Sequence, residues 1–205
     1  AMLVTGSQIG LGARNVHWET SGAYTAELAA PMLTEIGVVW VIVGHSERRT
    51  LVAETDETAL DRARAAQAAG LEVIYCIGET LAERDAGETF AVLERQTAAL
   101  GALDPGHLVL AYEPVWAIGS GRSATPAQAQ EAHAFLRVRI ASIFDGAAAD
   151  DMRILYGGSL KPSNADEILP LADVDGGLVG GASLDVGSFS AIIRAAADCA
   201  AGDES

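Results

Sequence analysis

The sequence predicts an α/β protein in which helices cover a parallel β-sheet. Six short aliphatic or β-branched runs recur along the 205 residues, and each run is followed by a helical pattern. The runs are apolar on both of the faces that a strand would present, which is typical of parallel sheets buried on both sides. Such a chain can form either an open doubly wound sheet or a closed (β/α) barrel.

The expected strands are residues 9–13, 38–43, 72–77, 108–112, 153–156 and 177–179. An open doubly wound sheet would be favoured by a GxGxxG motif after the first strand, but the loop there reads RNVHWETSGAYT. No linker, low-complexity tract or internal repeat beyond the βα unit divides the chain. We therefore expect one domain over residues 1–205.

Three of the expected helices have clear signals. A helix over residues 26–36 would carry one apolar stripe, formed by Leu28, Met32, Leu33 and Ile36. A second, over 56–69, is expected to end at Gly70. A third is expected to begin after Thr125, which is followed by a proline and a capping-box glutamine, and to reach Phe144.

Composition and charge limit the possible functions. Half of the residues are hydrophobic, so the chain can bury a substantial core, and no apolar run approaches the ~20 residues of a membrane helix. Because no signal-peptide pattern opens the sequence, we expect a cytoplasmic protein, with Cys76 and Cys199 as free thiols. A net charge of -15 argues against nucleic acid or an anionic membrane as a partner.

An anionic small molecule can still bind, because backbone N–H groups create a local positive potential even in a protein with a negative net charge. Polar or glycine-rich sequences follow most of the expected strands, at His45, Glu79, Glu113, Gly157–Gly158 and Gly180–Gly181. In parallel α/β folds, sites are built at that edge of the sheet. These positions are therefore the candidate functional residues.

Glu113 ends a strand and is followed by an apolar loop that runs from Pro114 to Gly121. Read alone, Glu113 is equally an ordinary solvated carboxylate at a strand end. A loop with apolar bulk between a proline and two glycines is instead typical of a lid, whose closure would expel water and strengthen the carboxylate as a base. The lid residues are Pro114, Val115, Trp116, Ala117, Ile118, Ser120 and Gly121.

His45 stands where a strand ends and a short helix can begin. A single histidine at such a place is more often a capping or core residue than a catalyst. A helix N-terminus disfavours its cation, and a neutral imidazole can donate a hydrogen bond to a carbonyl oxygen. We expect Glu47, Arg48 and Arg49, which follow it, to form structural ion pairs.

The glycine pairs can be simple tight turns, or together they can form a phosphate cradle that ends in a short helix within GASLDVGSF. We interpret Trp18, Trp40 and Trp116 as packing residues and Cys76 as a buried thiol. Four histidines without paired spacing predict no metal site.

Six motifs, GARNVHWETSGAYTAE, VIVGHSERR, CIGET, AYEPVWAIGSGR, YGGSLKPSN and GGLVGGASL, occur in this order and spacing. Together they resemble triosephosphate isomerases from about Ile9 to the end of the chain. The resemblance implies a TIM-type (β/α) barrel that interconverts dihydroxyacetone phosphate and glyceraldehyde 3-phosphate through an enediolate, in glycolysis and gluconeogenesis. It also implies that no cofactor is used.

The same resemblance assigns roles residue by residue. Glu113 matches the base and His45 the neutral electrophile, a pairing that is already established for this family. The backbone phosphate contacts are matched by Gly119, Ser159, Gly180 and Gly181. The loop from Pro114 to Ala124 matches the mobile lid, and the loop at 17–25 matches the dimerisation loop.

Two small departures from the family pattern occur, since Arg14 replaces a usual glutamine and Ala26 a usual glycine. The large departure is length: the barrel needs ~250 residues and eight strands, whereas this chain supplies 205 and six. The first two strands, with a catalytic asparagine and lysine, have no counterpart. Lys161, the only lysine, matches a helix-start position instead.

These features predict an incomplete barrel with about six strands, strongly impaired isomerase activity and a homo-oligomer. Either the strands close into a smaller barrel, or another copy covers the exposed edges and apolar surface. The alternatives are a non-catalytic phosphate-binding or structural remnant of the enzyme, and a different phosphate-handling barrel enzyme. The long lid and GHSERR motifs disfavour the last of these.

Overall fold

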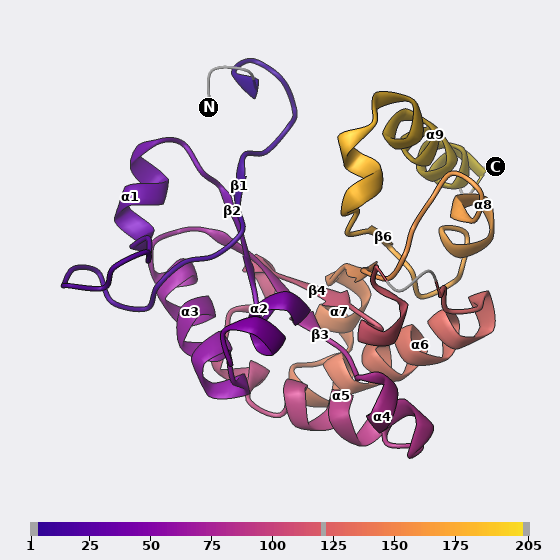
Figure 1. Cartoon of the computed structure of the whole chain (residues 1–205), viewed down its shortest axis with the longest axis horizontal. Helices are drawn as coiled ribbons and strands as arrows, with labels where there is room; N and C mark the ends of the chain where they lie inside the picture. The colour runs from indigo at the N-terminus through magenta and orange to yellow at the C-terminus, as the bar shows by residue number, and fades with distance from the viewer. Residues whose placement is uncertain (1–3, 120–121, 203–205) are drawn as a thin grey trace.

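A computed structural model describes residues 4–119 and 122–202 of the chain. Its centre is one sheet of six parallel strands: β1 (Gly12–Ala13), β2 (Trp40–Val43), β3 (Glu72–Ile77), β4 (Leu108–Tyr112), β5 (Ile154–Tyr156) and β6 (Gly176–Gly177). The strands follow one another in chain order, whereas a doubly wound sheet reverses its order partway. The sheet is therefore an incomplete TIM barrel, open between β1 and β6 (Figure 1).

Helices connect the strands and cover the outside of the sheet (Figure 1). They are α1 (Ala30–Glu35), α2 (Ser46–Leu51), α3 (Asp56–Ala68), α4 (Leu81–Asp85), α5 (Thr89–Thr97), α6 (Pro126–Ile143), α7 (Gly146–Asp151), α8 (Ala165–Ile168) and α9 (Val186–Gly202). Two 3-10 helices, η4 (Val115–Ala117) and η5 (Gly181–Leu184), lie in loops after β4 and β6. In the described part of the chain, no helix is long and apolar enough to cross a membrane.

The predicted helix signals are confirmed where they are strongest. Thr125 caps α6 through a complete capping box with Gln128, and Phe144 is the residue at its C-terminal cap. Helix α3 is followed by Gly70, whose φ of 77° lies in the left-handed region that glycine tolerates best.

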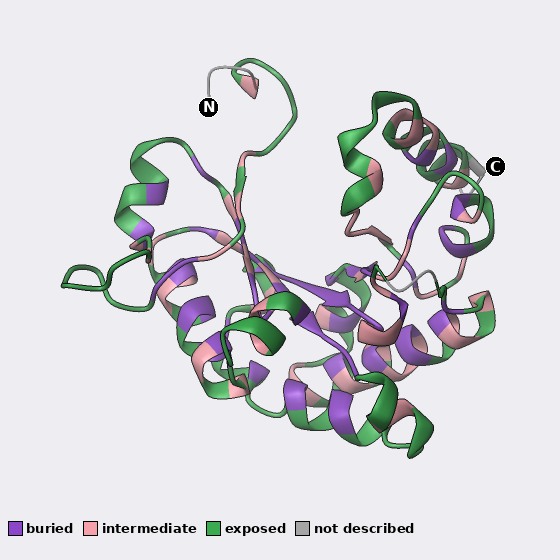
Figure 2. Cartoon of the chain, in the orientation of Figure 1, coloured by how far each residue is buried: buried purple, intermediate pink, exposed green. Residues whose placement is uncertain are grey.

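The buried residues are concentrated in the central strands of the sheet. All five residues of β4 are buried, and β3 is buried at four of its six positions (Figure 2). Helices α3 and α6 contribute the opposing apolar side chains, among them Leu60, Leu136 and Ile140. Central strands of a parallel sheet have neighbours on both edges and helices outside, so nearly every residue in them is buried.

The helix predicted over residues 26–36 is shorter in the structure, and its apolar stripe does not form a buried face. Helix α1 covers only Ala30–Glu35, and of the stripe only Leu33 is buried. Leu28, Met32 and Ile36 are exposed, at 46%, 54% and 58%. The apolar residues repeat at helical spacing, but α1 is short and packs only one narrow face against the core.

The terminal strands also differ from the prediction. Strand β1 spans two residues instead of 9–13, and Ile9 is 68% exposed. Strand β6 is Gly176–Gly177 instead of 177–179. Among the described residues, each of these strands has a partner on one side only, so fewer residues are held in the ladder.

Ala26 has a φ of 71°, in the left-handed region that only glycine adopts freely. This explains why glycine is usual in the matching position. Its own side chain is exposed, so the cost of this residue is one of backbone conformation and not of packing.

Arg48 and Arg49 form the structural ion pairs that the sequence predicts. Arg48 pairs with Glu54, whose side chain is buried and also pairs with buried Arg62, and Arg49 pairs with Asp56 at 2.6 Å. For Glu47 the prediction was wrong: its carboxylate is exposed and pairs with no cation in the described part of the chain.

Candidate active site

The candidate residues lie after successive strands, at one edge of the sheet. His45 follows β2, Glu79 follows β3, Glu113 follows β4, Ser159 follows β5 and Gly180 follows β6. Because all six strands are parallel, their carboxyl ends share that edge. The fold thus brings together loops that lie far apart in the sequence.

His45 is the N-cap residue of α2, as its position predicts. Its Nδ1 accepts a hydrogen bond from the Glu47 amide at 3.2 Å, so the ring hydrogen of the neutral imidazole is on Nε2. That Nε2 lies 3.0 Å from Oε1 of Glu113. The two candidate catalytic side chains are therefore in direct contact.

Glu113 is almost completely buried, with 2% of its surface exposed. Its Oε2 accepts a hydrogen bond from the Ser46 amide at 2.9 Å, and the Ser46 hydroxyl lies 3.3 Å from Oε1. Burial raises the pKa of Glu113 above its usual value of 4.5, while His45 and the Ser46 donors lower it in part. The carboxyl group is thus a stronger base than a solvated glutamate.

Two glycines leave room for Glu113, a role that sequence reasoning missed. A Cβ at Gly78 would lie 1.8 Å from the Glu113 carbonyl oxygen, and one at Gly157 would lie 2.8 Å from its Cγ. The signal was present as glycines after two strands, but only the structure shows what they adjoin.

The loop after Glu113 is attached to Glu79, which follows β3. Its residues up to Gly119 are described, whereas Ser120 and Gly121, also predicted as lid residues, lie outside the described residues. The Val115 amide donates to the Glu79 carbonyl oxygen at 3.0 Å, and Trp116 Nε1 donates to Glu79 Oε1 at 2.8 Å. Trp116 is thus more than a packing residue.

Glu79 is a further residue whose role the sequence did not reveal. It is fully buried, and its carboxylate also accepts a hydrogen bond from the Tyr112 hydroxyl and pairs with Arg84 at 3.0 Å. The Arg84 guanidinium lies over the Trp116 ring, 4.8 Å from its centroid. These contacts hold the start of the loop in one position.

The candidate phosphate loops lie beyond β5 and β6. Ser159 is bound to the loop after Glu113, because both its amide (3.2 Å) and its hydroxyl (2.7 Å) donate to the Ala117 carbonyl oxygen. Gly180 is the N-cap of η5 and Gly181 its first residue, so the predicted short helix exists. Both glycines are exposed, as is Gly119, whose φ is 65°.

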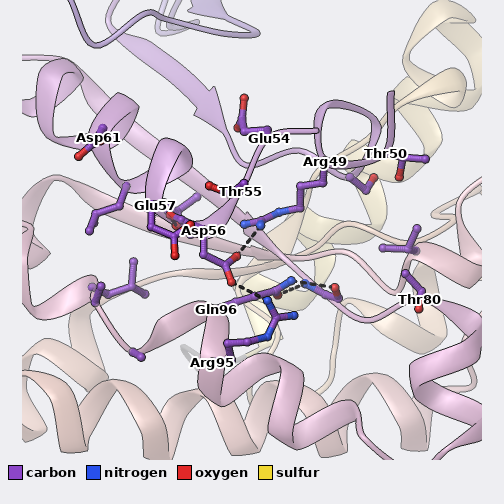
Figure 3. A pocket seen from close by; sticks show the side chains of 18 of the residues that line it. Arg49, Thr50, Glu54, Thr55, Asp56, Glu57, Asp61, Thr80, Arg95 and Gln96 are labelled. Atoms are coloured by element: carbon purple, nitrogen blue, oxygen red, sulfur yellow. Dashed lines mark hydrogen bonds and ion pairs between the residues drawn. The ribbon is translucent and has the colours of Figure 1, made fainter. Parts of the chain in front are cut away.

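A cavity of about 810 Å³ lies behind this site, among α2, α3 and α5 (Figure 3). Ser46, Gly78 and Val115 line it, but His45, Glu113 and Ser159 do not. Its charged groups bind one another: Asp56 pairs with Arg49 at 2.6 Å and with Arg95 at 2.7 Å. We therefore regard the cavity as a structural feature outside the candidate site.

In residues 4–119 and 122–202, no three His, Cys, Asp or Glu side chains are placed to hold a metal ion. Cys76 is a buried free thiol, as predicted, and Cys199 is also free.

Comparison with known proteins connects this geometry to one family. The family model described as triosephosphate isomerase matches residues 1–196. The triosephosphate isomerase of Bordetella pertussis is 53% identical over 198 residues, which cover 95% of this chain and 78% of the relative. That of Alkalilimnicola ehrlichii is 56% identical over 193 residues, covering 93% and 77%, and that of Chlorobium phaeovibrioides is 49% identical over 195 residues, covering 94% and 78%.

Proposed function

Because the chain belongs to the triosephosphate isomerase family, we propose that it interconverts dihydroxyacetone phosphate and glyceraldehyde 3-phosphate, at a strongly reduced rate. The observation that carries this proposal is the contact of 3.0 Å between His45 Nε2 and Glu113 Oε1. A buried carboxylate beside a neutral imidazole can serve proton transfer at a carbon next to a carbonyl group.

Glu113 removes a proton from the carbon that bears the hydroxyl group, and the electron pair left behind forms the enediolate. The His45 Nε2 hydrogen, held by Glu113 in the unliganded protein, turns to the substrate carbonyl oxygen and stabilises its negative charge. His45 Nε2 gives its hydrogen to the former carbonyl oxygen and takes the hydrogen of the former hydroxyl oxygen, so the carbonyl group moves to the carbon that carried the hydroxyl group. Glu113 returns its proton to the neighbouring carbon. No net proton is gained or lost.

The phosphate group is bound by backbone amides in this proposal. Gly119, Ser159, Gly180 and Gly181 follow β4, β5 and β6, and the 3-10 helix η5 begins at Gly181. Amides at a helix start suit an anion even in a chain with a net charge of -15.

We expect a low rate because the resemblance implies a catalytic lysine, and no residue of the given sequence matches it. Lys161, the only lysine, is exposed and lies just before α8. Losing one preorganised donor to a developing negative charge costs roughly 2.7 to 4 kcal/mol, which corresponds to a rate about a hundred to a thousand times lower.

The test is isomerisation of glyceraldehyde 3-phosphate by the purified chain and by Glu113→Gln, which keeps the shape of the side chain but removes the base. We expect slow turnover by the chain and a further loss of about a hundredfold or more in the variant. Equal rates would contradict the proposal. They would favour a phosphate-binding remnant, which calorimetry with inorganic phosphate would then detect or reject.

We also propose that the chain forms a homo-oligomer through the loop at 17–25 and helix α1. This surface exposes Tyr24, Leu28, Met32 and Ile36 within thirteen residues. Such a cluster of exposed apolar side chains is typical of a protein interface.

A further inference from the structure

Gln96 lies on α5 and is buried, with 7% of its surface exposed. Its side-chain amide binds the backbone of Gly78 in both directions. The Gly78 amide donates to Gln96 Oε1 at 2.7 Å, and Gln96 Nε2 donates to the Gly78 carbonyl oxygen at 3.2 Å. Without this side chain two buried backbone groups would lose a hydrogen-bond partner, so Gln96 fixes the backbone at Gly78.

Gly78 lies just beyond the hydrogen-bonded ladder of the sheet. Strand β3 ends at Ile77, and β2 ends earlier, with Val43 in register with Tyr75. A neighbouring strand supplies backbone groups with both a donor and an acceptor. The primary amide of Gln96 offers the same two groups. The side chain thus supports the chain after β3 at a point that β2 does not reach.

The backbone on both sides of Gly78 holds the candidate base and the start of the loop after it. The Ile77 carbonyl oxygen accepts a hydrogen bond from the Glu113 amide at 2.7 Å, and the Glu79 carbonyl oxygen accepts one from the Val115 amide at 3.0 Å. Gly78 itself approaches Glu113 so closely that a Cβ would lie 1.8 Å from the Glu113 carbonyl oxygen. A displacement of Gly78 must therefore move Glu113.

Gln96 also lies between this contact and open space. Together with Gly78 and Ser46, it lines the cavity of about 810 Å³ among α2, α3 and α5 (Figure 3). If the Gln96 amide released Gly78, water in the cavity could approach Glu113 from behind. Burial is the main cause of the raised pKa of Glu113, so hydration from this side would lower that pKa.

We propose that Gln96 is a positioning residue for the isomerisation: through Gly78 it fixes the place of Glu113 and keeps water from the rear of the carboxylate. Its hydrogen bonds go to Gly78, so its effect on Glu113 is indirect. This inference rests on the proposed isomerase function. The ionisation of Glu113 can nevertheless be measured without turnover.

Gln96→Met removes both hydrogen bonds and keeps an unbranched side chain of similar length. We expect kcat to fall about ten- to a hundredfold, because a small displacement of a catalytic group is enough to slow proton transfer. KM should change much less, since Ser159, Gly180 and Gly181 follow β5 and β6. Infrared difference spectra, taken against Glu113→Gln in the same background, should show Glu113 titrating at lower pH than in the unmodified chain.

Gln67 provides a matched control, because it makes the same two-way contact at another place. It lies on α3, where its Oε1 accepts from the Asp104 amide and its Nε2 donates to the Asp104 carbonyl oxygen, both at 2.9 Å. Gln67→Met should leave kcat and the titration of Glu113 unchanged. Equal effects of the two substitutions would give Gln96 a merely structural role and overturn the proposal.

If Gln96→Met does not fold, NMR titration of the unmodified chain decides. The side-chain amide signals of Gln96 should move as Glu113 ionises and should lose this movement in Glu113→Gln, whereas those of Gln67 should not follow Glu113. Gln96 signals that ignore the ionisation of Glu113 would overturn the inference. If the titrations behave as expected but the chain shows no turnover, only the proposed function is contradicted.

Discussion

Glu113 is subject to two opposing influences on its pKa. Desolvation raises the pKa, while His45 and Ser46 lower it by stabilising the carboxylate. Since the base must be ionised to act, kcat/KM should fall as pH falls through this raised pKa, above 4.5.

Ser46→Ala removes one donor from the carboxylate, so the pKa of Glu113 should rise further and the acid limb of kcat/KM should move to higher pH. Thr50→Ala, an exposed position on the same helix, is the matched control and should leave the limb in place. If turnover is too slow, infrared difference spectra against Glu113→Gln report the same titration. If the acid limb of kcat/KM stays in place or moves to lower pH in Ser46→Ala, this account is contradicted.

His133 is a buried residue that catalysis does not use. Burial lowers its pKa to about 4, and its Nδ1 lies 3.1 Å from the Asp173 carbonyl oxygen. The unfolded chain protonates this ring near pH 6.5, whereas the folded chain resists protonation until about pH 4. The free energy of unfolding should therefore decrease as pH falls between these values.

Urea unfolding at pH 7 and pH 4.5 measures this effect. His133 alone should account for a loss of about 2 kcal/mol, a share absent from His133→Gln. His107→Asn is the control of opposite sign, because Glu72 raises the pKa of exposed His107, so the contribution of His107 to stability grows as pH falls and its removal should not abolish the loss due to His133. If His133→Gln does not fold, NMR titration of the wild type decides: a ring that titrates near 6.5 would refute the prediction.

At the scale of elements, the loop before α1 contains a strained residue. Ala26→Gly should relieve the left-handed backbone conformation and stabilise the chain by about 1 kcal/mol, raising Tm by about 2 to 4 °C. Ala196→Gly on α9, exposed and in a helix, should instead destabilise by about 1 kcal/mol. Thermal unfolding compares the two variants, and equal effects would show that strain at Ala26 does not matter.

The elements differ in how far the sequence predicts them. The bounds of β3 and β4 match the prediction at both ends, because a central strand is apolar along most of its length and that run is visible in the sequence. Strands β1 and β6 do not match, since their length depends on a partner strand and no local pattern contains that information. The stripe on residues 26–36 shows the same limit for a helix.

The site was predictable to a similar degree. His45 and Glu113 are recognisable as residues that follow strands, but their mutual contact depends on β2, β3 and β4 being adjacent. Glu79 could not be assigned a role, because its partners Tyr112, Arg84 and Trp116 come from three other segments.

For the whole molecule, the proposed oligomer is directly measurable. Sedimentation at micromolar concentration should show self-association, because the surface around α1 exposes four large apolar side chains. Met32→Glu should shift the chain towards monomer, and Val138→Glu should not. Met32 is 54% exposed, so the substitution should not disturb folding. A compact monomer of the unmodified chain would contradict the proposal.

The double hydrogen bond from Ser159 to the Ala117 carbonyl oxygen couples two parts of the molecule. If the Ser159 amide binds the substrate phosphate, it must release Ala117, because one N–H cannot serve both acceptors fully. Phosphate occupancy and release of the loop after Glu113 then form a single thermodynamic linkage, and each shifts the other by the same free energy. The concentration of a phosphate ligand would set the fraction of molecules in which this loop is free to move.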